Sequence, residues 1–154
     1  MPIDGKIIIE RAQASDADLV ADLVHRLLSE LAGGKDVSLE DLRTSARKLM
    51  AQGLVRSVIA RLDENPVGVL CLNECAAIYA GGRFGEITEL YVAAECRSLG
   101  IAPKLIEEAK QIGRESGWGR LEVGAPDMPA WERTFNFYLR EGFEEVGPRL
   151  KLLI

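Results

Sequence analysis

Glu86-Ile-Thr-Glu-Leu-Tyr-Val-Ala-Ala-Glu-Cys-Arg-Ser-Leu-Gly-Ile-Ala-Pro-Lys-Leu-Ile-Glu-Glu-Ala109 is the stretch from which the architecture of this chain can be read. Its first part has the pattern of a strand and its last part that of a helix, and a loop holding Arg97, Gly100 and Ala102 joins them. The N-terminus of a helix offers unpaired backbone N–H groups, and its dipole favours negative charge. The sequence therefore predicts an anion-binding turn at this junction.

One strand and two helices are predicted upstream of this turn. Residues 6–11 include three consecutive isoleucines, which are typical of a strand. Residues 15–33 begin with Ser and carry Asp three positions later, a pattern that resembles a capping box, and the helix is expected to end at Gly33-Gly34. Ser38 and Asp41 predict the start of a second helix, which ends near Gly53.

An antiparallel meander is predicted between the second helix and the turn. Residues 55–61 and 67–72 read as strands, and Asp63-Glu64-Asn65-Pro66 between them signals a tight hairpin. Residues 73–85 are less regular and are interpreted as the end of one strand and a turn. Residues 86–92 form the next strand.

Further elements follow the turn. A helix ends at Gly117, residues 119–123 form a strand, and Asp127-Met128-Pro129 opens a last helix. Residues 143–146 and 150–154 are expected to form a final hairpin. The order predicts one α/β (α+β) domain over residues 1–154, with a central, mostly antiparallel mixed sheet of about seven strands flanked by about four helices.

The composition narrows the class of protein. The chain has 154 residues, 47% of them hydrophobic and 28% charged, which is typical of a globular protein. The net charge of −5 does not suggest a nucleic-acid partner. No run is long enough for a membrane span, and the N-terminus lacks a signal-peptide pattern, so a cytoplasmic location is expected. Cys71, Cys75 and Cys96 lack the spacing of zinc ligands, so we expect reduced thiols and no metal.

Two motifs carry a resemblance to a known family. Arg97-Ser-Leu-Gly-Ile-Ala102 fits the pattern Arg/Gln-x-x-Gly-x-Gly/Ala and follows a strand that ends in Leu-Tyr-Val. Phe137-Tyr-Leu-Arg-Glu-Gly-Phe143 fits Phe-Tyr-x-x-x-Gly-Phe. With this element order, the chain resembles the GNAT superfamily of acyl-CoA-dependent N-acetyltransferases. A dinucleotide- or nucleotide-binding protein is disfavoured, because the loop contains neither of the corresponding glycine motifs.

The resemblance implies that acetyl-CoA is the co-substrate. In the family, the strand pairs with the pantetheine arm, and the loop amides bind the pyrophosphate. The alternative for Arg97 is a solvated loop arginine that does not touch phosphate. At the position of Trp131 many members carry a cofactor-binding Asn, so Trp131 is expected to pack beside the pantetheine or the acceptor. The expected cofactor-binding residues are Leu90, Tyr91, Val92, Arg97, Ser98, Leu99, Gly100, Ile101, Ala102 and Trp131.

The resemblance also implies catalytic roles. Tyr138 matches the tyrosine that protonates the leaving sulfur, and its alternative is a core aromatic. Either Glu86 or Glu89 is expected to act as base, directly or through water; the alternative for each is a solvated surface or an ion pair. Because side chains alternate along a strand, the two glutamates are predicted to face opposite sides of the sheet.

The acceptor is expected to be a primary amine, more readily a small molecule than a protein. Specificity is expected from residues 24–35, 73–84 and 124–131, and Tyr79-Ala-Gly-Gly-Arg-Phe84 either lines the acceptor site or is a plain turn. A non-catalytic acyl-CoA-binding sensor on the same fold is the alternative function. The sequence is compatible with a homodimer but does not predict one.

Overall fold

Five strands form one mixed sheet in this computed structural model, which describes residues 5–31, 37–124 and 131–154. The strands lie in sequence order, the first four pair antiparallel, and the fifth pairs parallel with the fourth. They are β1 (Ile7–Arg11), β2 (Arg56–Leu62), β3 (Asn65–Ala77), β4 (Gly82–Val92) and β5 (Leu121–Val123). The predicted α/β class with a largely antiparallel sheet is confirmed.

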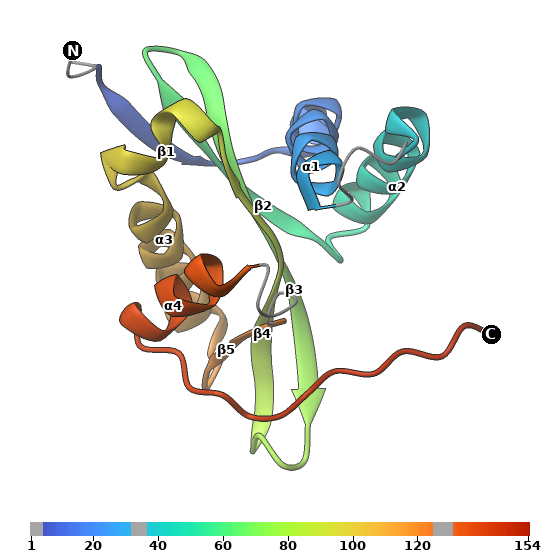
Figure 1. Cartoon of the computed structure of the whole chain (residues 1–154). Coiled ribbons are helices and arrows are strands. Elements are labelled where there is room, and N and C mark those ends of the chain that lie inside the picture. Colours follow the sequence, from blue (N-terminus) through green and yellow to red (C-terminus); the bar gives the residue numbers. More distant parts are fainter. Residues whose placement is uncertain (1–4, 32–36, 125–130) are drawn as a thin grey trace.

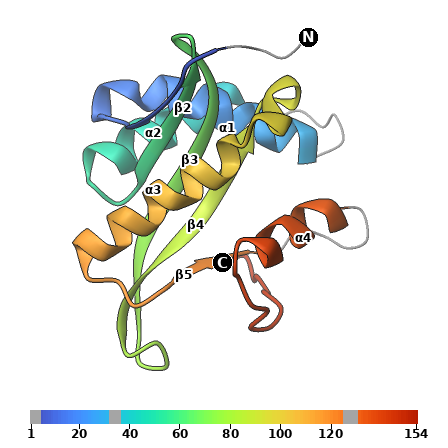
Figure 2. The same ribbon diagram turned by 90° about the vertical axis from the view of Figure 1, so that its left-hand side faces the viewer.

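Helices cover both faces of the sheet (Figure 1). α1 (Ala17–Leu31) and α2 (Leu39–Ala51) lie on one face, and α3 (Ile101–Ser116) and α4 (Glu132–Arg140) lie on the other. Figure 2 shows α3 running diagonally across the sheet. Two short 3-10 segments, η1 (Ala14–Asp16) and η2 (Ala94–Leu99), precede α1 and α3. No helix within the three described ranges is both long and apolar enough to span a membrane.

Local capping explains where the first two helices begin. The Ser38 side chain accepts a hydrogen bond from the Asp41 N–H at 3.2 Å, which confirms the predicted start of α2. The first helix differs from the prediction, because Gln13 rather than Ser15 provides the cap. The Gln13 N–H donates to the Asp16 carboxylate at 2.8 Å and closes η1, so that α1 begins only at Ala17.

The core lies on both sides of the central strands. Val58–Ala60 on β2 and Val69–Leu72 on β3 are buried without alternation, as expected when both faces are covered. Leu23 of α1 and Leu105 of α3 are at most 1% exposed and contribute to this core from the two sides. The buried strand β3 therefore supports β4 rigidly along one edge.

The final hairpin is the main error of the prediction. Residues 143–154 contain neither strand nor helix, and Leu150 and Leu152 are 94% and 88% exposed. The described sheet thus has five strands rather than about seven, whereas the four α-helices agree with the prediction. An alternating pattern predicts a preference for extended backbone, but two strands without a third partner form a marginal hairpin in water. Gly33-Gly34 and the predicted helix start at Asp127 lie outside the described residues.

Candidate active site

The site begins where β4 and β5 separate. β5 pairs only with Gly85–Ile87, and β4 continues to Val92 without a partner on that side in the described residues. The Ala93 N–H donates to the Val67 carbonyl at 2.8 Å, so Ala93 bonds toward β3. Because hydrogen bonds alternate along an antiparallel pair, the N–H groups of Leu90 and Val92 point to the open side. This edge is available to a ligand.

The predicted anion-binding turn lies at the end of this edge. Gly100 has a φ of +74°, a left-handed conformation that favours glycine, and α3 starts at the next residue. The first amides of α3 lack intrahelical partners. Ser98 and Gly100 are exposed, Leu99 and Ala102 are half-buried, and Ile101 is buried under the helix. The backbone of this turn therefore faces outward while Ile101 anchors it.

Arg97 connects the end of β4 to α1. Its Nε donates to the Val92 carbonyl at 2.9 Å, and one Nη lies 2.7 Å from the Glu30 carboxylate. The guanidinium is also 6.0 Å from the centre of the Tyr91 ring. The hydrogen bond that Arg97 donates to the Glu30 carboxylate raises the pKa of Arg97 above its ordinary value. In this conformation Arg97 holds the strand in place, and its guanidinium does not point freely into the turn.

A bulge changes the orientation of the two candidate bases. Cys71 pairs with Glu89, but the next residue of β3 pairs with Ile87, so Thr88 is an extra residue in β4. Asn73 pairs with Glu86. Because paired residues of an antiparallel ladder share a face, Glu86 and Glu89 both point to the face of Cys71 and Asn73. The prediction that the glutamates face opposite sides is therefore wrong.

This shared face is the one covered by α1 and α2. A Cβ added at Gly68 would lie 3.5 Å from Leu105 of α3, which places Gly68, and by alternation Leu70 and Leu72, toward α3. The side chains at 71 and 73 point the other way. The two glutamates consequently lie across the sheet from α3.

Glu86 and Glu89 have different surroundings. The Glu86 side chain is 17% exposed, accepts a hydrogen bond from the Cys75 thiol at 3.7 Å, and lies 2.6 Å from an Nη of Arg149. Glu89 is half-buried, contacts the Thr88 hydroxyl, and helps to raise the pKa of the buried Cys71 thiol, for which desolvation is the larger cause. Glu86 lines the large cavity described below, and Glu89 is not part of its lining.

Tyr138 lies on α4 in an aromatic cluster. Its ring centre is 5.4 Å from that of Phe137 and 5.5 Å from that of Phe143, and the residue is 9% exposed. Burial raises its pKa to about 12, so the hydroxyl stays protonated and available as a donor at neutral pH. Tyr138 therefore packs as a core aromatic residue and also reaches the candidate site, because it lines the cavity described below.

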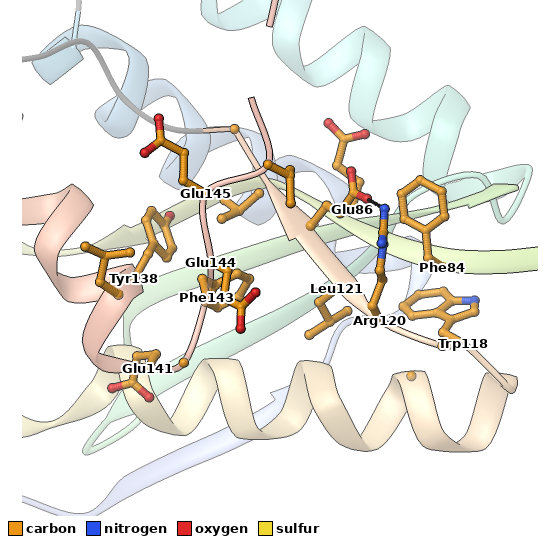
Figure 3. A pocket seen from close by; sticks show the side chains of 18 of the residues that line it. Phe84, Glu86, Trp118, Arg120, Leu121, Tyr138, Glu141, Phe143, Glu144 and Glu145 are labelled. Carbon is orange, nitrogen blue, oxygen red and sulfur yellow. Dashed lines mark hydrogen bonds and ion pairs between the residues drawn. The ribbon is translucent and has the colours of Figure 1, made fainter. Parts of the chain in front are cut away.

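A cavity of about 1240 Å³ joins these groups (Figure 3). Tyr138 lies at one end, and Phe84, Trp118 and Arg120 gather at the other. Its lining includes residues of α3 as well as Glu86, which lie on opposite faces of the sheet, so the cavity extends around the free edge of β5. It is large enough for a small organic molecule.

The Tyr79–Phe84 segment borders the far end of this cavity. The Tyr79 and Phe84 ring centres are 6.2 Å apart, and the Arg120 guanidinium lies 4.9 Å from the first and 5.7 Å from the second. The Tyr79 hydroxyl also lies 3.3 Å from the Glu122 carboxylate. The segment is therefore more than a plain turn, because it packs against β5 beside the cavity.

Trp131 lies outside the cavity lining, whereas Arg149 is part of it. The Trp131 carbonyl accepts the N–H groups of Thr134 and Phe135, each at 3.1 Å, and so closes the first turn of α4, while its side chain is outside the cavity lining. Sequence reasoning missed Arg149, because no local pattern connects it with Glu86.

Comparisons with known proteins agree with this geometry. The family model described as Acetyltransferase (GNAT) family matches residues 23–143. The chain belongs to the GNAT family. An uncharacterized N-acetyltransferase of Archaeoglobus fulgidus is 30% identical over 111 residues, which cover 70% of this chain and 74% of the relative.

Solved structures of other GNAT proteins share the fold. An aminoglycoside acetyltransferase from an uncultured soil metagenomic sample is 25% identical, with a TM-score of 0.79 and 96% coverage of both chains. A predicted acetyltransferase of Clostridium acetobutylicum, solved with acetyl-CoA, is 18% identical, with a TM-score of 0.79 and 96% coverage of both. A ribosomal-protein-alanine N-acetyltransferase of Brucella melitensis is 21% identical, with a TM-score of 0.75 and coverage of 97% and 100%. The last two similarities concern the fold alone.

Proposed function

We propose that this GNAT protein transfers the acetyl group of acetyl-CoA to a primary amine of a small molecule, by direct attack in a ternary complex. The observation that carries the proposal is the open edge of β4, which runs from the bulge at Thr88 to Val92 and is followed by η2 and the turn at Gly100. A cavity that contains both a carboxylate and a protonated tyrosine opens beside it.

The open edge and the turn are suited to the two polar parts of acetyl-CoA. The unpaired N–H groups of Leu90 and Val92 can pair with the amides of the pantetheine arm as an added strand would. The amides of residues 100–102 can bind the pyrophosphate, because they stand at the N-terminus of α3, where negative charge is favoured, and Ser98 and Leu99 lie beside them. Nothing lies within 4 Å of the position of a Cβ on Gly100, so the backbone there is open to a close approach.

The chemistry needs an acceptor for one proton and a donor for another. The amine nitrogen forms a bond to the acetyl carbon, and the bond between that carbon and sulfur breaks. A carboxylate, Glu86 or Glu89, takes the proton that the nitrogen loses, directly or through water. Tyr138 donates its proton to the leaving sulfur, and a backbone N–H of the open β4 edge that the pantetheine leaves unpaired polarises the thioester carbonyl.

Two observations favour a small acceptor. The cavity is concave, with aromatic side chains at both ends and charged side chains such as Glu86 and Arg149 in its lining, which can orient a small polar molecule. A structural relative at 25% identity is an aminoglycoside acetyltransferase, whose acceptors are small amines.

The test is an acceptor screen. Purified protein is incubated with acetyl-CoA and a panel of amines, thiol release is followed, and products are identified by mass spectrometry. Thiol release that depends on an amine, with an acetylated product, supports the proposal. Binding of acetyl-CoA without consumption of any amine, unchanged by Tyr138→Phe, supports the sensor function instead.

A further inference from the structure

An ion pair within the site points to the kind of acceptor. Arg149, on the segment that follows α4, places one Nη 2.6 Å from the Glu86 carboxylate. Both residues line the cavity that holds Tyr138. The chain itself therefore supplies a cation at this place.

The two partners of the pair are unequal. The Glu86 side chain is 17% exposed and fixed on β4, which is paired on both sides at this residue. The Arg149 side chain is 66% exposed and lies in residues 143–154, which have no regular secondary structure. A largely buried carboxylate is costly to leave without a cation, whereas an exposed guanidinium is readily solvated. Arg149 is thus the partner that can be replaced, and Glu86 requires a replacement.

A second group beside Glu86 lacks a partner. The Asn73 side-chain oxygen is buried and accepts no hydrogen bond within the described residues. Asn73 is the cross-strand partner of Glu86, and both side chains contact the Cys75 sulfur, at 3.4 Å and 3.7 Å. Asn73 does not line the cavity, so its buried oxygen adds to the polar surroundings of the carboxylate without contacting a ligand.

Glu86, we propose, forms a subsite for a cationic group of the acceptor that is distinct from the nitrogen that reacts, and Arg149 occupies this subsite when the acceptor is absent. The inference rests on the proposed function. A nitrogen held as a cation by a buried carboxylate has no free lone pair for attack, so the group bound here stays charged. The acceptor therefore belongs to the class of short diamines and related dications.

The bulge sets the spacing of the two carboxylates. Their partners on β3, Cys71 and Asn73, are two residues apart, which corresponds to about 7 Å along a strand. A diamine with a four-carbon chain spans a similar length. One nitrogen can then lie at Glu86 while the other lies toward the unpaired part of β4 beyond the bulge, where transfer takes place.

The first experiment measures binding without turnover. 1,4-Diaminobutane and the neutral 1,4-butanediol are titrated into the full-length protein by calorimetry in the presence of free CoA. The diamine is expected to bind and the diol not to bind. Arg149→Ala removes the competing guanidinium and should tighten diamine binding about three- to tenfold. Lys151→Ala removes a cation from an exposed position of the same segment and should change nothing.

Two further variants test the subsite itself. Glu86→Gln should weaken diamine binding at least about tenfold. Asn73→Leu should leave diamine binding nearly unchanged, because Asn73 does not line the cavity. Equal binding of diamine and diol, or weaker diamine binding by Arg149→Ala, overturns the proposal.

Kinetics separate this inference from the proposed function. If the protein acetylates amines, Glu86→Gln should raise KM for 1,4-diaminobutane at least about tenfold, and 1-aminobutane should be a poor substrate. A loss of kcat at unchanged KM would make Glu86 the base and refute the subsite. If the binding pattern holds but no amine is acetylated, the subsite stands and the proposed function fails.

Discussion

Replacement of Tyr138 by Phe is the most direct test of the catalytic proposal. The substitution removes one hydroxyl and keeps the ring contacts with Phe137 and Phe143 at 5.4 and 5.5 Å. Burial is the cause of the raised pKa of Tyr138, so the hydroxyl contributes little net stability, and the free energy of unfolding should change by less than about 1 kcal/mol. Loss of a general acid should lower kcat about 10²- to 10⁴-fold, which corresponds to about 3–5 kcal/mol in the barrier.

The assay for this variant is thiol release at saturating acetyl-CoA and amine, with thermal unfolding measured on the same samples. KM for acetyl-CoA should stay within about twofold, because the hydroxyl acts on the leaving sulfur rather than on binding. Phe137→Leu is the matched control: it disturbs the same ring contact but keeps the hydroxyl, and it should retain most of the rate. A Tyr138→Phe enzyme with kcat within threefold of wild type would refute the acid role.

Three further predictions concern pH and glycine. The pKa of Tyr138 is about 12 in the folded protein and ordinarily 10, so its contribution to stability is full below pH 10 and is lost as the pH rises through 12. In denaturant unfolding, the free energy of unfolding of wild type should therefore fall by about 2 kcal/mol relative to Tyr138→Phe between pH 9 and 12. A Cβ on Gly85 would lie 2.2 Å from the Trp118 ring, so Gly85→Ala should destabilise the fold by about 3 kcal/mol, whereas Gly119→Ala, with nothing within 4 Å, should change the unfolding free energy by less than about 0.5 kcal/mol. Gly100→Val forces a β-branched residue to a φ of +74° and should cost about 1–2 kcal/mol and weaken acetyl-CoA binding by calorimetry.

The features that the sequence predicted correctly depend on local interactions. The cap of α2 joins residues three positions apart, and the turn at Gly100 depends on one glycine between a strand pattern and a helix pattern. The open edge of β4 was expected from the resemblance to the GNAT superfamily, because the motif at Arg97–Ala102 identifies the strand that precedes it. Such features are encoded within a few residues, so a single sequence can show them.

The features that were missed depend on contacts across the fold. The residues around Thr88 show no sequence pattern that predicts a bulge. Thr88 is the extra residue because of how β4 pairs with β3. The ion pair between Arg149 and Glu86 joins residues from different elements, and nothing near either position indicates it. The final hairpin was predicted from a correct local preference, but that preference does not determine whether a partner strand pairs with it.

The bulge at Thr88 accounts for two properties of the site together. β4 stops pairing with β5 at Ile87, and the extra residue follows immediately. A bulge bends its strand and increases the local twist, so β4 turns away from β5 at this point and exposes the backbone of residues 88–92. The same extra residue reverses the alternation and places Glu89 on the face of Glu86. One residue thus opens the edge proposed for acetyl-CoA and places two carboxylates on the same face of the sheet, so the proposed cofactor edge and the candidate bases both belong to β4.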